Sequence, residues 1–172
     1  MLQLNEKEYA HYYKPYIDAL AADEKSIVEH LNDTLDDAIG VLSNLPKEKQ
    51  IYSYAEGKWT IKELLQHIID SERVFAYRAL RFARNDTTTL PGFEQDDYRA
   101  IYNANKRDFK DLLEELVLTR KSIILLFKSF GEEELMRIGI ASGTNMSVRA
   151  LGYVISGHLQ HHLNIIKKRY LY

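Results

Sequence analysis

The chain has 172 residues, of which 45% are hydrophobic and 28% charged, and this composition fits one soluble domain with a sizeable core. The formal net charge is −2 and neither sign is concentrated in one segment, so the sequence lacks the basic footprint of a nucleic-acid binder. It contains no cysteine, which excludes disulfides, thiolate metal ligands and a cysteine nucleophile. The N-terminus is too polar for a secretory signal and no window of ~18 residues is apolar throughout, which predicts a cytoplasmic protein without a membrane segment.

Apolar residues recur at helical spacing in four long stretches, and little of the chain alternates like a strand. The second stretch begins with a capping-box pattern, Thr60-Ile61-Lys62-Glu63. The predicted helices cover approximately Lys25–Ser43, Thr60–Ala83, Tyr102–Phe130 and Ser147–Tyr170. The sequence therefore predicts an all-α protein, a four-helix bundle.

Residues 1–172 are expected to form a single domain, in which residues 1–23 are an N-terminal extension that packs on the bundle. Within this extension, the tyrosine-rich stretch Tyr9–Leu20 predicts a short extra helix or a cover. The three connections between the long helices have roughly 16 residues each, whereas bundle connections usually have 2–8. We expect these long connections to cross an end of the bundle or to line a site.

His158 and His162 lie four residues apart within Gly157–Leu163, in the predicted fourth helix. At ~100° per residue they project within ~40° of each other, in the middle of an apolar stripe. An imidazole buried without a hydrogen-bond partner costs roughly 1–3 kcal/mol, so the pair requires partners or a metal ion.

His67 lies in the predicted second helix, on the flank of its apolar stripe. If the second and fourth helices are in contact, His67, His158 and His162 can bind one divalent ion, although satisfied core histidines are the plainer alternative. Three protein ligands leave coordination positions open, as in catalytic sites, where a metal activates water or a thiol. Imidazole ligands suit Zn, Ni, Fe and Cu alike, so the ligand type alone does not select the metal. We expect a divalent ion, with Zn or Ni first and Fe or Mn as alternatives.

The remaining histidines are assigned by spacing. His161 lies three residues after His158, so it either replaces His162 as a ligand or lies beside the site at the helix margin. His11 and His30 have no partner at helical spacing and are expected to have surface or packing roles.

The sequence does not identify a catalytic residue, but Arg120 is a candidate because it falls within the apolar stripe of the predicted third helix. Near the metal it could bind an anionic substrate group. The alternatives are an ion pair with Glu72 or Glu115, or snorkelling to the surface. Asp70, one turn beyond His67, is either the carboxylate that orients this imidazole or an exposed helix charge.

The connection 85–98 mixes turn-forming residues with Phe93 and Tyr98, which suggests a cover over the mouth of a pocket. Its acidic residues Asp96 and Asp97 are also typical of a solvated helix start.

Three groups of motifs resemble the DinB superfamily, whose YfiT-like members are described as metal-dependent hydrolases. The similarity extends from about Leu35 to the C-terminus. The motifs are Lys58–Arg73 with its KWTIKELLQHIIDSER sequence, Arg78–Arg84 followed by Leu90–Phe93, and Gly157–Leu163 with its GHLQHHL sequence.

This resemblance implies a bacterial four-helix bundle with crossed connections, commonly a homodimer. It also implies that His67, His158 and His162 are the metal ligands. It favours a hydrolase that acts on a small-molecule substrate. Related proteins also include thiol S-transferases that use bacillithiol and a mycothiol-dependent isomerase, so thiol transfer is an alternative, as is a non-catalytic stress-related bundle.

Overall fold

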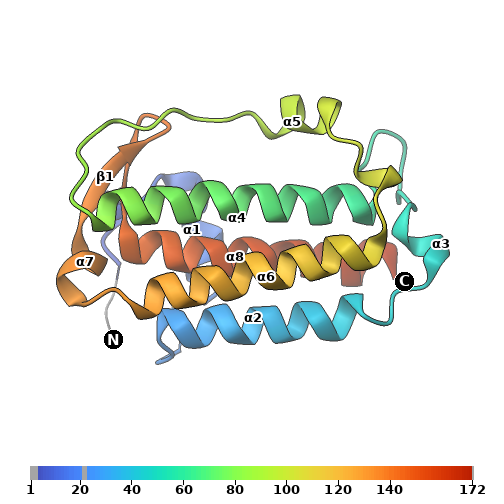
Figure 1. Cartoon of the computed structure of the whole chain (residues 1–172), viewed down its shortest axis with the longest axis horizontal. Coiled ribbons are helices and arrows are strands. Elements are labelled where there is room, and N and C mark those ends of the chain that lie inside the picture. The colour runs from blue at the N-terminus through green and yellow to red at the C-terminus, as the bar shows by residue number, and fades with distance from the viewer. Residues whose placement is uncertain (1–3, 21–22, 172) are drawn as a thin grey trace.

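The computed structural model describes residues 4–20 and 23–171 and contains the predicted bundle of four long helices (Figure 1). The protein is mostly helical, as the sequence predicts, with one small sheet in the described residues. The last long helix continues as a π-helical turn at Ile166–Tyr170. The long helices are α2 (Ile27–Leu42), α4 (Ile61–Ala83), α6 (Phe109–Lys128) and α8 (Val148–Ile165).

Helix α4 begins with the capping box that the sequence predicts. The Thr60 hydroxyl accepts a hydrogen bond from the Glu63 amide, and the Glu63 carboxylate accepts one from the Thr60 amide. Substituting such a cap by alanine costs about 1 kcal/mol. The cap therefore fixes where α4 begins, two turns before His67.

The predicted start of the third helix, Tyr102, is wrong. Helix α6 begins at Phe109, and its cap is Asp108, whose side chain accepts a hydrogen bond from the Lys110 amide. The polar stretch before this cap forms a 3-10 turn at Ala104–Lys106 instead. A local side-chain cap thus overrides a helical pattern that continues through it.

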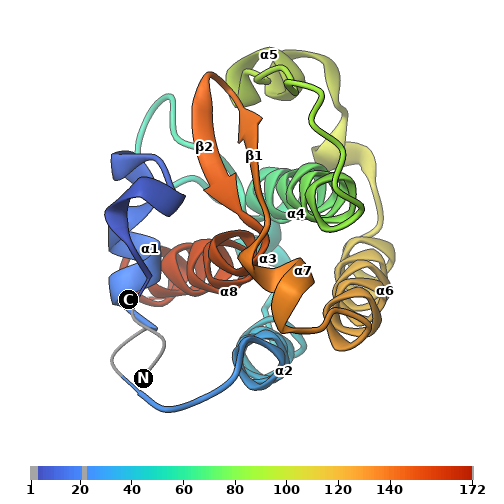
Figure 2. The same ribbon diagram turned by 90° about the vertical axis from the view of Figure 1, so that its left-hand side faces the viewer.

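The four long helices form a ring in which α4 lies diagonally across from α2 (Figure 2). Helix α8 packs against both α2 and α4, and α6 packs against the same two helices from the other side. The connections from α2 to α4 and from α6 to α8 cross the ends of the bundle, whereas residues 84–108 run along its length, above α4 (Figure 1). This crossed order brings the second and fourth long helices into contact.

The long connections contain short elements that the sequence did not predict in detail, among them a β-hairpin. The hairpin turn consists of Ser142 (φ 53°) and Gly143 (φ 75°), and two consecutive positive φ values suit a tight hairpin turn. Strands of four residues are too short for alternation to be recognised. The elements are α3 (Lys47–Gln50), α5 (Gln95–Ile101), α7 (Glu132–Met136), β1 (Ile138–Ala141) and β2 (Thr144–Ser147).

The N-terminal segment contains helix α1 (Lys14–Asp18), which packs against α8. Gly157 makes this close approach possible, because a Cβ atom there would lie 2.2 Å from the backbone oxygen of Tyr16. Residues 1–3, 21 and 22 of the predicted extension lie outside the described residues, as does residue 172. No helix within the described ranges is long and apolar enough to cross a membrane.

Candidate metal centre

The structure brings His67 of α4 together with His158 and His162 of α8. The Nε2 atom of His158 lies 3.1 Å from the Nε2 atom of His67 and 3.1 Å from that of His162. The potential ligand atoms of all three lie within 4.8 Å of one another. His67 and His158 are each only 6% exposed, and His162 is partly buried. Three imidazole nitrogens therefore converge on one point between two neighbouring helices.

Aromatic rings surround these imidazoles. The Trp59 ring packs edge-on against His67 with a centroid distance of 5.0 Å. Tyr16 of α1 and Phe75 of α4 pack edge-on against His158 at 5.6 and 6.0 Å. These rings fix the orientation of the imidazoles and separate them from bulk water.

Burial lowers the pKa of each of the three histidines. The pKa of His67 falls to about 4 because of burial, and that of His162 falls to about 3 because of burial and its histidine neighbours. The pKa of His158 lies well below its ordinary value for the same reasons. All three imidazoles are consequently neutral at pH 7, the state in which a ring nitrogen can ligate a metal.

The three imidazoles cannot satisfy all their ring nitrogens by hydrogen bonds to one another, and a bound cation would accept the lone pairs of the Nε2 atoms. A neutral imidazole has one N–H donor and one acceptor nitrogen, yet His158 Nε2 faces two other Nε2 atoms. The Nδ1 atoms of His158 and His162 are also buried without a hydrogen-bond partner among the described residues. If the protons are on Nδ1, the three Nε2 lone pairs are directed at one shared position, a donor set that suits Zn or Ni.

The side chain nearest the second nitrogen of His67 is Ser71, not Asp70 as hypothesised. Ser71 Oγ lies 3.5 Å from His67 Nδ1, a long contact. Asp70 instead accepts a hydrogen bond from Gln66 Nε2 at 3.0 Å. The relevant spacing is one full turn, four residues after His67, and this criterion identifies Ser71 from the sequence.

His161 lies outside the three-nitrogen cluster, at the helix margin that was one of its two predicted positions. Its side chain is exposed, and its ring lies 5.3 Å from those of Tyr16 and His162. His11 is exposed, whereas His30 is buried with its Nε2 atom 3.1 Å from Asp23 Oδ1. Neither of the last two contributes to the cluster.

The hydrogen-bonding capacity of Arg120 is used within the core, which favours the alternative ion pair over the hypothesised contact with a substrate. Its Nε donates to Glu72 at 3.1 Å, and its Nη2 donates to Glu72 and to the Ile155 carbonyl oxygen. Its Nη1 donates to the Leu31 carbonyl oxygen and to Thr34 Oγ1. All five guanidinium N–H groups thus have partners, and these come from each of the other three long helices. The alternative ion pair with Glu72 is the arrangement present.

A cavity of about 290 Å³ adjoins the histidines, and both His67 and His158 line it. The connection before α5 borders it through Phe93, whereas Tyr98 stacks behind Phe93 with a ring separation of 5.5 Å. The connection is held against the hairpin, because the Leu90 amide donates to the Ile140 carbonyl oxygen at 2.9 Å. The other lining residues are Tyr12, Tyr13, Tyr16, Ser71, Phe75, Arg78, Glu94, Gln95 and Ser142.

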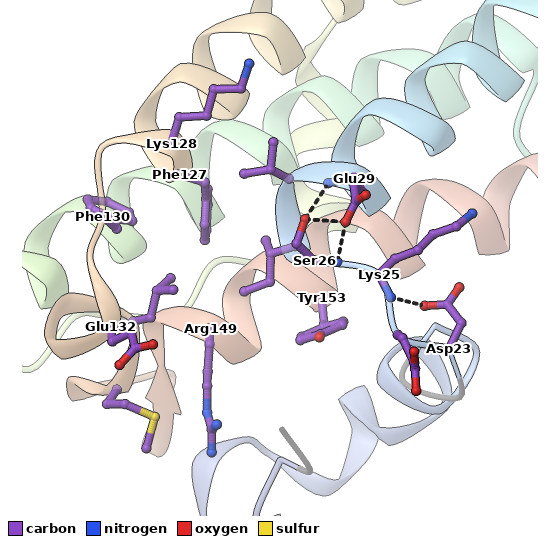
Figure 3. A pocket seen from close by; sticks show the side chains of 15 residues that line it. Asp23, Lys25, Ser26, Glu29, Phe127, Lys128, Phe130, Glu132, Arg149 and Tyr153 are labelled. Carbon is purple, nitrogen blue, oxygen red and sulfur yellow. Dashed lines mark hydrogen bonds between the residues drawn. The ribbon is translucent and has the colours of Figure 1, made fainter. Parts of the chain in front are cut away.

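A larger cavity of about 1000 Å³ lies elsewhere, between the start of α2, the end of α6 and the start of α8 (Figure 3). Phe127 and Tyr153 line it together with charged residues such as Lys25 and Arg149. None of the three clustered histidines borders it. The smaller cavity is therefore the one connected to the candidate metal centre.

Comparison with known proteins places this chain in a family. Residues 30–166 match the sequence model of the DinB superfamily, and the chain belongs to this superfamily. A protein of Oceanobacillus iheyensis named "Putative metal-dependent hydrolase" is 27% identical over 160 residues, covering 88% of this chain and 91% of its own.

A solved structure has the same fold. It is YfiT from Bacillus subtilis, described as "a probable metal-dependent hydrolase with an unusual four-helix bundle topology". It superposes with a TM-score of 0.75 at 12% identity, over 96% of this chain and 90% of YfiT. At this identity the similarity establishes the crossed four-helix bundle alone.

Proposed function

We propose that the protein binds one divalent metal ion through His67, His158 and His162 and hydrolyses a small molecule held in the adjoining cavity. The observation that carries this proposal is the convergence of three neutral imidazole nitrogens at the wall of that cavity. The names of the relatives from Oceanobacillus iheyensis and Bacillus subtilis support it. Zn or Ni is the expected ion, and Fe or Mn also suits the site.

The residues around the cavity have separable roles in this proposal. A divalent ion, when bound by three ligands with positions left open, supplies Lewis acidity that activates water and polarises a carbonyl or phosphoryl oxygen. The three imidazoles hold the ion, and Ser71 orients His67. The rings of Trp59 and Phe75 keep the histidines out of bulk water.

Elemental analysis of the purified protein tests the metal-binding premise. We expect about one equivalent of metal in the wild type and loss of most of it in His158→Ala and His162→Ala. His161→Ala is the matched control, because it removes an imidazole of the same helix that lies outside the cluster. Full metal content in the first two variants, or none in a metal-replete wild type, would contradict the proposal.

Turnover of ester, amide and phosphoester substrates tests hydrolysis. Activity that requires the metal and is lost in His158→Ala supports a hydrolase. Thiol transfer is a second candidate because open metal positions facing a cavity also suit a thiolate, and with no cysteine in the chain the thiol must be a co-substrate. Turnover that saturates with bacillithiol and is absent without it would replace the hydrolase with a transferase. If metal removal unfolds the protein and no substrate is turned over, the metal is structural.

A further inference from the structure

Arg78 of α4 is a buried cation that lines the same cavity as His67 and His158. Arg78 is only 2% exposed. Nη2 donates to the Pro91 carbonyl oxygen at 3.0 Å and to Ser142 Oγ at 2.9 Å. Among residues 4–20 and 23–171, no carboxylate lies within 4.0 Å of this guanidinium. Its further neighbour is the Tyr13 hydroxyl, which also lines the cavity and whose pKa burial raises despite the nearby guanidinium, so this partner is neutral as well.

The other two buried arginines of the described chain make Arg78 exceptional. Arg120 forms a two-point ion pair with Glu72, and Arg149 forms one with Glu8. Burying a cation without a counter-charge is costly, so such a residue is normally paired. Arg78 has only neutral oxygens as partners, the Tyr13 hydroxyl among them, and it lines the cavity without a counter-charge.

The position of Arg78 on α4 directs it toward the histidines. It lies eleven residues after His67, which corresponds to ~20° around the helix and ~16 Å along it. Side chains in helices lean toward the N-terminus, which for Arg78 is the direction of His67, and both residues line the one cavity. One molecule within the cavity can therefore contact Arg78 at one end and the histidines at the other.

The walls next to Arg78 are held in place before any ligand binds. Ser142 lies in the hairpin turn, and its amide donates to the Leu90 carbonyl oxygen at 3.1 Å. Pro91 follows directly in the same connection, so both partners of Arg78 belong to one hydrogen-bonded unit. Phe93 faces the guanidinium, with its ring centroid 5.9 Å from the Arg78 Cζ atom. An arginine fixed in this way loses little entropy when it binds a planar anion.

We propose that Arg78 binds the anionic oxygen group, a carboxylate or a phosphate, of a small substrate whose opposite end reaches the histidines. This inference rests on the proposed function only for the end of the substrate that reaches the histidines. The volume of about 290 Å³ is at the low end for ligand pockets and restricts the substrate to a small molecule. Phe75 and Phe93 offer apolar faces to its body, and exposed Glu94 at the border disfavours additional negative charge.

Calorimetric titration with benzoate, phenyl phosphate and neutral benzamide tests the proposal, using metal-free and metal-loaded protein. We expect one of the two anions to bind both forms, and benzamide to bind at least tenfold more weakly. The preferred anion identifies a carboxylate or a phosphate site. Arg78→Met should weaken its binding to metal-free protein at least tenfold, whereas Arg73→Met, which removes an exposed arginine of the same helix, should not.

Ser142→Asp provides a second test that does not depend on the stability of Arg78→Met. Aspartate tolerates the positive φ of this position and places a carboxylate beside Arg78. This internal anion should block benzoate and phenyl phosphate while the protein stays folded, and Ser142→Asn should retain binding. Anion affinity unchanged in Arg78→Met and Ser142→Asp, or no anion binding by the wild type, would overturn the proposal.

The two proposals can fail separately. If the wild type binds no metal but binds an anion in a manner that requires Arg78, the metal proposal fails and the anion site stands. If the wild type retains metal but anions bind it equally with and without Arg78, the anion site fails alone.

Discussion

The bundle contains two buried polar clusters that solve the same physical problem in opposite ways. In the first, Arg120 and Glu72 are both fully buried, and every N–H group of the guanidinium has a partner. In the second, the Nε2 atom of His158 faces the Nε2 atoms of both His67 and His162 at 3.1 Å, and neutral imidazoles cannot satisfy one another fully in this arrangement. A satisfied cluster ties helices together, whereas convergent unsatisfied groups next to a cavity are suited to bind a ligand.

Arg78 and Arg120, two of the three buried arginines of the described chain, show the same difference within one residue type. Arg120 has a carboxylate partner and carbonyl oxygens around it, so its position in the apolar stripe reflects the structure of the core. Arg78 has only neutral partners, the Pro91 carbonyl oxygen and the Ser142 and Tyr13 hydroxyls, and a cavity lies beside it. Burial alone therefore does not distinguish the two arginines, whereas the presence or absence of a carboxylate partner does.

The largest effect is expected from breaking the satisfied cluster. Glu72→Gln leaves Arg120 buried without a counter-charge, and removing one partner of a buried ion pair costs about 3–5 kcal/mol. Urea unfolding of metal-free protein should show this loss. The double variant Glu72→Leu with Arg120→Met should recover most of it, since an apolar pair of similar volume is often neutral. If the single variant unfolds like the wild type, the cluster does not support the bundle.

The histidine cluster should make the stability of the metal-free protein sensitive to pH. The folded pKa of His67 is about 4, below the ordinary value of 6.5, so the unfolded state takes up a proton first as the pH falls. The contribution is complete above about pH 6.5, declines below it and levels off near pH 4. Between pH 7 and 5 one such histidine accounts for roughly 2 kcal/mol.

Urea midpoints at pH 7 and 5 measure this effect, and His67→Gln should reduce the difference between them. His11→Gln, a change at an exposed histidine, is the control. An equal difference in wild type and His67→Gln would show that folding does not lower the pKa of His67.

The smallest effect is expected around His67. Ser71→Ala should lower metal affinity about tenfold, the low end of the range for residues that orient a ligand, because the Oγ to Nδ1 contact is long. Asp70→Asn should leave the affinity unchanged, since Asp70 contacts Gln66. Competition titrations with a chelator measure both affinities, and the reverse ranking would restore Asp70 as the orienting group.

Features set by helical periodicity could be predicted from the sequence. The spacing of His158 and His162 fixes their common face whatever the rest of the chain does, and the Thr60 cap marks the start of α4. The three-histidine site also required contact between the second and fourth long helices, which periodicity cannot predict. The crossed order of the bundle provides this contact between α4 and α8.

Features that depend on contacts between distant segments could not be predicted. Arg120 and Arg78 both lie on helix faces that look suitable for a site, and only the surrounding helices and the hairpin determine which one has a carboxylate. The hairpin itself was missed because its strands are short. Ser71 could have been predicted from its position four residues after His67, whereas the carboxylate of Asp70 is the group that the sequence suggests.

Anomalous diffraction from crystals of the zinc- or nickel-loaded protein tests the central claim most directly. The account predicts one strong peak equidistant from the Nε2 atoms of His67, His158 and His162, at about 2.0–2.1 Å from each, with further coordination positions facing the cavity. A peak that involves His161 in place of His162, or metal bound elsewhere with the three imidazoles unliganded, would contradict it.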